Sequence, residues 1–170
     1  MRLIDPDVPR ERIDAGIRAA VHPRHDPARW ALPLLDELDR TIDGVWQRVA
    51  LDEEAFDALW LPEHTGEPCH GDSHRLGDAP GGSSLRDAAA WLTAHGDVYA
   101  AANPSCWGRI IAASRQPSSP IVVADRSVGD RLKPDDAALV VVDGLHRALG
   151  YRIDGRRTCE AYIRRAVGNR

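Results

Sequence analysis

Residues 138–153 read Ala138-Leu-Val-Val-Val-Asp-Gly-Leu-His-Arg-Ala-Leu-Gly-Tyr-Arg-Ile153 and have the clearest pattern of secondary structure in the chain. Its first five residues form a continuous apolar run rich in valine, which is typical of a buried strand. Asp143-Gly144 ends the run. Leucine and isoleucine then recur at the spacing of an α-helix, which Gly155 is placed to end. The stretch therefore predicts a strand, a tight turn and a helix in direct succession.

Three further segments have the composition of strands. A β-branched and aromatic run predicts a strand over Val45–Leu51, and an apolar run predicts another over Pro120–Ala124. Residues Thr158–Ile163 alternate between apolar and polar side chains, with Cys159 on the apolar face. This alternation predicts a half-buried strand.

The N-terminal quarter of the chain, residues 1–43, is predicted to be helical. A first helix follows Pro9 and carries Ile13 and Ile17 at helical spacing. A second begins at Pro33 and presents an apolar stripe, and Gly44 is a natural end for it.

Three more helices are predicted in the rest of the chain. Asp52 is placed as the N-cap of a short helix that extends to Trp60. Ser84, with an acidic residue three positions later, caps a helix that Gly96 would end. A further helix is predicted over Pro104–Ser114.

The length and composition favour one ordinary globular domain. The chain has 170 residues, 43% hydrophobic and 28% charged, which suits a single core spanning residues 1–170. Its formal net charge of −4 argues against extensive nucleic-acid binding, which needs a basic surface. The three cysteines are odd in number and far apart, so reduced thiols in the cytoplasm are expected. The sequence predicts neither a signal peptide nor a membrane span, and it leaves the oligomeric state open.

The turn after the valine run has the residues of an anion site. The first turn of a helix has N–H groups without partners and a partial positive charge. Gly144 lets a phosphate approach the backbone, and Arg147 can grip phosphate oxygens through two donors. Basic residues such as His146 and Arg147 are unfavourable in a first helical turn, and a bound anion would explain them. The alternative is that Asp143 is a simple N-cap and that the basic side chains pack locally or are solvated.

The segment Val140-Val-Val-Asp-Gly-Leu-His-Arg-Ala148, followed by Gly155 and a strand, resembles the nucleotide-binding core of the ParB/sulfiredoxin superfamily. The resemblance covers about residues 119–165. Sulfiredoxins have a nucleophilic cysteine where this chain has Leu145, and chromosome-partitioning ParB proteins have Gly-Glu-Arg-Arg at the turn. The chain is most similar to the free-serine kinase branch, whose motif is Asp-Gly-His-His-Arg, and departs from it only at Leu145.

The resemblance implies an α+β fold. A small mixed sheet would form the ParB/sulfiredoxin-like nucleotide-binding core over residues 44–165. The sequence pattern adds a helical N-terminal extension over residues 1–43 and a long loop over 62–82. It also implies transfer of a phosphoryl group from ATP or ADP to a small hydroxylated metabolite such as a free amino acid. The alternative is a non-catalytic regulatory module of the same fold that binds a nucleotide, DNA or a protein.

The resemblance also implies roles for the residues of the turn. Gly144, Leu145, His146 and Arg147 would bind the phosphates, with His146 also a candidate for catalysis. Asp143 would hold the Mg²⁺ ion that bridges the phosphates, or act as the base for the acceptor hydroxyl.

Asp125 and Arg126 follow the Pro120–Ala124 strand. In parallel α/β units, ligands bind at the carboxyl ends of strands, so both side chains are expected in the same crevice as Asp143. There, Asp125 is the second candidate base and Arg126 a second phosphate ligand. A solvated loop is the alternative.

Two other regions carry weaker signals. The loop over 62–82 holds possible metal ligands without the spacing of a known site: His64, Cys69, His70, Asp72 and His74. This loop is also a candidate for closing over a substrate. The segment Gly81-Gly-Ser-Ser84 is either a second phosphate cradle or, more simply, a helix cap.

Overall fold

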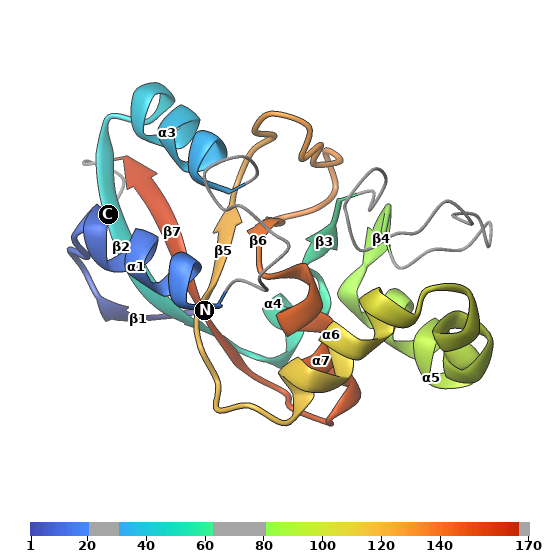
Figure 1. Ribbon diagram of the computed structural model, residues 1–170. Helices are drawn as coiled ribbons and strands as arrows, with labels where there is room; N and C mark the ends of the chain where they lie inside the picture. The colour runs from blue at the N-terminus through green and yellow to red at the C-terminus, as the bar shows by residue number, and fades with distance from the viewer. Residues whose placement is uncertain (21–30, 63–80, 167–170) are drawn as a thin grey trace.

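A mixed β-sheet runs through the molecule, with helices on both of its faces (Figure 1). The computed structural model describes residues 1–20, 31–62 and 81–166. Within these residues the sheet has seven strands in the order β1-β2-β7-β5-β6-β3-β4. The strands are β1 (Arg2–Asp5), β2 (Gly44–Leu51), β3 (Trp60–Leu61), β4 (Ser83–Ser84), β5 (Ile121–Ala124), β6 (Val140–Asp143) and β7 (Cys159–Ala166).

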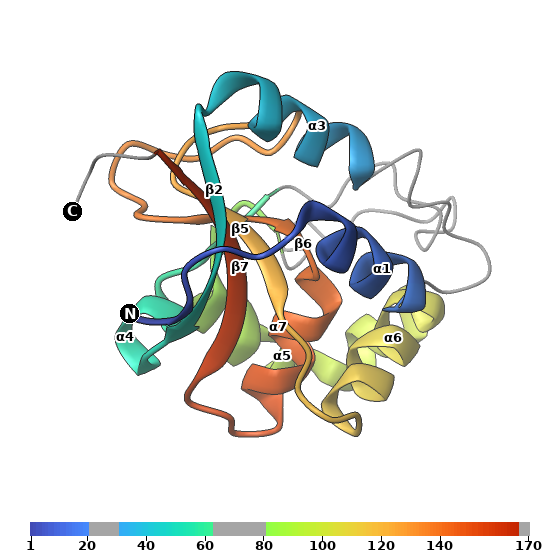
Figure 2. The ribbon, with the colours of Figure 1, turned by 90° about the vertical axis from the view of Figure 1, so that its left-hand side faces the viewer.

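Two groups of helices cover the sheet. The helices are α1 (Arg10–Ala20), α3 (Leu32–Thr41), α4 (Glu53–Asp57), α5 (Leu85–Ala102), α6 (Pro104–Ser114) and α7 (Leu145–Ile153). In Figures 1 and 2, α3 lies at one end of the view, and α5, α6 and α7 lie together at the other. The predicted α+β class is therefore confirmed.

The central strands are buried on both faces. In β5, Ile121 and Val123 join the core under α5, α6 and α7, while Val122 packs in a second core with α1 and α3. Strand β6 alternates in the same way, with Val141 in the first core and Val142 in the second. A strand between two helical layers has no polar face, which explains the continuous valine run.

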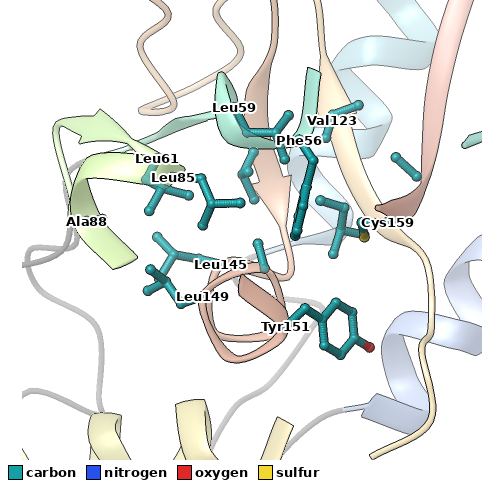
Figure 3. Packing of buried hydrophobic residues seen from close by; sticks show 14 of the residues in the cluster. Phe56, Leu59, Leu61, Leu85, Ala88, Val123, Leu145, Leu149, Tyr151 and Cys159 are labelled. Carbon is teal, nitrogen blue, oxygen red and sulfur yellow. The ribbon is translucent and has the colours of Figure 1, made fainter. Parts of the chain in front are cut away.

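Helix α7 anchors the first core. Leu145 and Leu149 point into a cluster that also contains Phe56 and Leu85 from distant parts of the chain (Figure 3). The helix spans Leu145–Ile153, as predicted, and Gly155 follows with a left-handed φ of 82°.

The N-terminal residues are only partly helical, so the prediction for residues 1–43 is wrong at their start. Helices α1 and α3 form as predicted, and Ile13 and Ile17 are buried. Arg2–Asp5, however, forms β1, which pairs antiparallel with β2. Four residues carry too little pattern to reveal a strand whose hydrogen bonds come from residues more than 40 positions away.

The helix after Asp52 is shorter than predicted. The Asp52 side chain does cap it, accepting from the N–H of Ala55 at 3.0 Å. The helix ends at Asp57, and Trp60 lies in β3, where its N–H donates to the carbonyl of Leu139 at 2.9 Å. Pairing with a distant strand therefore replaces the last helical turn.

The structure differs in detail from two other predictions. Helix α5 continues past Gly96 to Ala102 with a kink at His95, so the prediction that Gly96 ends it is wrong. Gly96 instead lies close to Trp107, and a Cβ there would be 3.1 Å from the indole. Strand β7 is buried on both faces near its middle, since Tyr162 packs in the second core. None of the helices within residues 1–20, 31–62 and 81–166 combines the length and the hydropathy that a membrane span needs.

Candidate functional site

The turn between β6 and α7 is built around a left-handed glycine. Gly144 has φ 96° and ψ 25°, a conformation that costs other residues about 1–2 kcal/mol. A Cβ at this position would lie 2.7 Å from Cγ2 of Ile121. Glycine is therefore required both by the backbone conformation and by the close approach of β5.

The N-terminus of α7 has no side-chain cap. Gly144 is the N-cap residue, and the first turn contains no acidic residue. The first helical hydrogen bond is donated by Ala148 to the carbonyl of Gly144 at 2.8 Å. The N–H groups of Leu145, His146 and Arg147 precede that bond and point along the helix axis toward the turn. This geometry suits an anion.

The Arg147 guanidinium is held by protein acceptors. It forms an ion pair with Asp143 and donates to Oγ of Ser119 at 3.2 Å and to the carbonyl of Pro120 at 2.9 Å. Its side chain is only 15% exposed. Arg147 therefore ties the end of β6 to the segment before β5 and orients the Asp143 carboxylate. These contacts differ from the expected two-donor grip on phosphate oxygens.

His146 points away from the turn, toward α6. Its Nε2 lies 3.2 Å from Sγ of Cys106, and the Tyr99 hydroxyl donates to the same sulfur at 3.1 Å. Leu145, where the resembled kinases have a second histidine, is buried in the first core (Figure 3). Leu145 can therefore offer a ligand only its backbone N–H.

Asp125 and Arg126 do not share the crevice of Asp143, so that prediction is wrong. Strands β5 and β6 are antiparallel, with Val122 opposite Asp143 and Ala124 opposite Val140. Asp125, one residue past the end of β5, therefore lies at the edge of the sheet opposite to the turn. Arg126 is half exposed and contacts Asp125 at 3.1 Å. The prediction assumed parallel strands, and a single sequence does not specify strand direction.

A cavity of about 500 Å³ lies beyond the other end of β6. It is lined by residues in and around α4, β3, β4, the start of α5 and the loop before β6: Asp57, Ala58, Trp60, Gly82, Ser83, Ser84, Arg86, Asp87, Asp136 and Ala137. The Ser84 hydroxyl caps α5, accepting from the N–H of Asp87 at 3.1 Å, which confirms the cap interpretation of this segment.

The described residues offer little to a metal ion. Among residues 1–20, 31–62 and 81–166, no group of three or more His, Cys, Asp or Glu side chains is placed to hold one. Asp143 is a single carboxylate already paired with Arg147. Mg²⁺ often binds through one or two carboxylates together with substrate phosphates, so Asp143 suits only an ion that arrives with a nucleotide. The candidate ligands His64, Cys69, His70, Asp72 and His74 lie outside the described residues.

Three side chains near the turn were not identified from the sequence. Ser119 contacts Arg147, Cys106 contacts His146, and Tyr99 donates to the sulfur of Cys106. Cys106 is 40 positions from His146 and Ser119 is 28 from Arg147. No spacing rule links residues so far apart, and only the packing of α5, α6 and β5 around α7 brings them together.

Comparison with known proteins gives a family but no characterised relative. No curated protein and no solved structure matches the chain. One family model, described as a family of unknown function (DUF6309), matches residues 22–168, which include the turn and every helix from α3 to α7. The chain therefore belongs to the DUF6309 family.

Proposed function

We propose that the protein transfers a phosphoryl group from ATP or ADP to a small hydroxylated metabolite such as a free amino acid. The phosphates would bind at the turn between β6 and α7. One observation carries the proposal: α7 begins at a left-handed glycine without a side-chain cap. A helix N-terminus of this kind offers N–H donors and partial positive charge to a phosphate.

The binding donors in this proposal are backbone groups. The N–H groups of Leu145, His146 and Arg147 would face the phosphates, and the left-handed Gly144 makes the turn that leaves these groups without a side-chain cap. The ion pair with Arg147 fixes the Asp143 carboxylate beside the same turn. The resemblance of this segment to the ParB/sulfiredoxin superfamily supports the assignment, and we infer that β5, β6, α7 and β7 correspond to its nucleotide-binding core.

Asp143 is the candidate base for the acceptor hydroxyl. A kinase of this kind needs a carboxylate near the hydroxyl that attacks the phosphoryl group. Asp125 lies at the opposite edge of the sheet from the turn, so it is too far from the proposed phosphate site to act as this base. Mg²⁺ would enter with the nucleotide, share the Asp143 carboxylate and neutralise phosphate charge.

A non-catalytic nucleotide-binding module is the second candidate. The observation that favours it is that the Arg147 guanidinium donates to three protein acceptors, on Asp143, Ser119 and Pro120. These contacts take the donors that a kinase would use on the transferred phosphoryl group. Such a module would bind nucleotide and show no turnover. A version that binds DNA would instead lose affinity steeply as salt is raised.

The first experiment is an NMR titration of ¹⁵N-labelled protein with ADP and ATP, each with and without Mg²⁺. We expect the amide resonances of Gly144, Leu145 and Arg147 to move with nucleotide, while that of Arg126 stays in place. Binding to the native state should also raise the melting temperature. If no nucleotide moves the amides of the turn, the phosphate site is absent and both candidates fail.

Two matched variants then separate the candidates. Asp143→Asn keeps the size of the side chain and should retain nucleotide binding but lose phosphoryl transfer, measured by ³¹P NMR with a panel of hydroxylated amino acids. Asp125→Asn should change neither property. Binding without turnover in the wild-type protein across the panel would favour the non-catalytic module over the kinase.

A further inference from the structure

Cys106, His146 and Tyr99 form a cluster that the proposed phosphate site does not use. The Cys106 sulfur lies 3.2 Å from Nε2 of His146 and accepts a hydrogen bond from the Tyr99 hydroxyl at 3.1 Å. The three residues come from α6, α7 and α5, whose packing holds them together. A thiol within hydrogen-bond distance of an imidazole is the pairing found in activated cysteine nucleophiles.

The position of Cys106 in its helix favours the ionised thiol. Helix α6 begins at Pro104, so Cys106 is its third residue. A negative charge in the first turn of a helix is stabilised by the helix dipole, and thiolates are favoured at such positions and beside a protonated histidine. The Tyr99 hydroxyl donates to the sulfur and also stabilises its charged form.

Cys159 provides a contrast within the same protein. It is buried in the first core, and burial raises the pKa of its thiol to about 12. Its sulfur has no imidazole partner among the interactions of the described residues and donates instead to the carbonyl of Glu160 at 3.2 Å. Cys106 is fully buried in the same core, so burial disfavours its thiolate as well. The difference is that its sulfur faces two polar groups that oppose this cost, the Tyr99 hydroxyl and the partly exposed His146 imidazole.

We propose that Cys106 and His146 form a thiolate–imidazolium pair that acts as a nucleophile toward small carbon electrophiles. His146 takes the thiol proton, and the sulfur uses the freed electron pair to form a bond to carbon. The leaving group departs with the bonding pair, and the imidazolium returns its proton to the leaving group or to water. The inference does not rest on the phosphate site, because it depends on the side chains of Cys106 and His146 and not on the backbone of α7.

The test is the pH dependence of alkylation by iodoacetamide, in which a carbon–sulfur bond forms and iodide leaves. Each cysteine is followed separately by mass spectrometry of its peptide. An ordinary thiol reacts about 50-fold more slowly at pH 6.5 than at pH 8.5, because its thiolate fraction falls by that factor. We expect the rate at Cys106 to fall less than about 5-fold over this range, with no labelling of Cys159 in the native protein.

Variants assign the effect to His146. His146→Gln keeps a polar group near the sulfur but cannot take a proton, so the rate at Cys106 should regain the steep dependence on pH. His95→Gln is the matched control, since this exposed histidine lies on α5, stacks on Trp91 and donates from Nδ1 to the carbonyl of that residue at 2.9 Å. Its pH profile should match that of the wild-type protein.

Two results would overturn the inference. One is a steep, ordinary pH dependence at Cys106 in the wild-type protein. The other is complete resistance of Cys106 to iodoacetamide in the native state when the urea-unfolded chain is labelled, which would make it a structural thiol like Cys159. Circular dichroism and the melting temperature of each variant show that the fold is retained.

Discussion

Asp57 of α4 accepts a hydrogen bond at 2.5 Å from Nε of Arg152, which lies 95 positions later on α7. Arg86 of α5 contacts the same carboxylate at 3.2 Å. The Asp57 side chain is 7% exposed and that of Arg152 is 25% exposed, so this carboxylate is buried where three helices meet while its arginine partners reach toward water. It therefore connects α7, which carries the candidate site, to α4 and α5.

Replacing Asp57 with asparagine should destabilise the protein. The change removes the charge that compensates Arg152 and Arg86, and breaking a well-buried pair of this kind costs several kcal/mol. We expect a loss of about 2–3 kcal/mol because Arg86 is largely exposed. Urea denaturation at pH 7 measures it. Asp154→Asn, which breaks the exposed pair with Arg156, is the control and should cost less than about 1 kcal/mol.

The same pair predicts a dependence of stability on pH. Burial alone would raise the pKa of Asp57, but the hydrogen bonds and charges of Arg152 and Arg86 outweigh it and hold that pKa below its ordinary value. The stabilisation is therefore fully present above about pH 4, the ordinary value, and is lost as the pH falls through the lowered pKa. The difference between wild type and Asp57→Asn should be constant from pH 5 to 8 and shrink in stronger acid. A difference that does not change down to pH 2 would contradict this assignment.

Gly144→Ala should damage the turn more than a left-handed conformation alone explains. The new Cβ would lie 2.7 Å from Cγ2 of Ile121 in the core. The alanine would also have to adopt the positive φ of Gly144. We expect a loss of about 3 kcal/mol or more. Gly155→Ala is the matched control, because its φ is also positive but nothing lies within 4 Å of the added methyl group. It should cost about 1 kcal/mol, and equal losses in the two variants would show that the contact with Ile121 does not matter.

Gly150 allows α6 and α7 to approach closely. A Cβ at this helical position would lie 2.4 Å from the carbonyl oxygen of Ile110 and 2.9 Å from the N of Ser114. Alanine normally stabilises a helix by about 1 kcal/mol over glycine. We nevertheless expect Gly150→Ala to lower the melting temperature, because the helices must separate. Gly108→Ala on α6 meets nothing within 4 Å and should raise it. If Gly150→Ala instead raises the melting temperature, α6 and α7 have room for a methyl group at this contact.

The elements predicted most accurately have local signals at both ends. Helix α6 begins at Pro104 and ends at Ser114, and α7 spans Leu145–Ile153, as their patterns predict. The valine run predicts a strand over residues 138–142, and β6 covers Val140–Asp143. In each case the helical spacing or the apolar run spans most of the element, so no distant contact is needed to recognise it.

The remainder of the fold and site depends on contacts between distant residues. Strands β1 and β3 are four and two residues long, and each forms because a partner from elsewhere offers hydrogen bonds. The direction of β5, which separates Asp125 from Asp143, is set by the whole sheet. The contact of Cys106 with His146 likewise follows from helix packing, which no local pattern encodes.

Asp39 is expected to hold α1 and α3 on the sheet. From α3 it pairs with Arg10 of α1, accepts from Nε1 of Trp46 on β2 at 2.8 Å, and contacts Arg164 of β7 at 2.8 Å. Asp36, one turn earlier, is 67% exposed and contacts only Arg10 among the partners found in the described residues.

The two aspartates therefore form a matched pair for testing how α1 and α3 are attached. Asp39→Ala removes the acceptor that the nearly fully buried Trp46 shares with two arginines. It should lower the free energy of unfolding by about 2 kcal/mol. Asp36→Ala should cost less than about 0.5 kcal/mol. Hydrogen exchange in the amides of α1 and α3 should accelerate in the first variant, while exchange in α7 should change much less, because α7 packs on the opposite face of the sheet. Equal acceleration in α7 would mean that the two layers unfold as one unit.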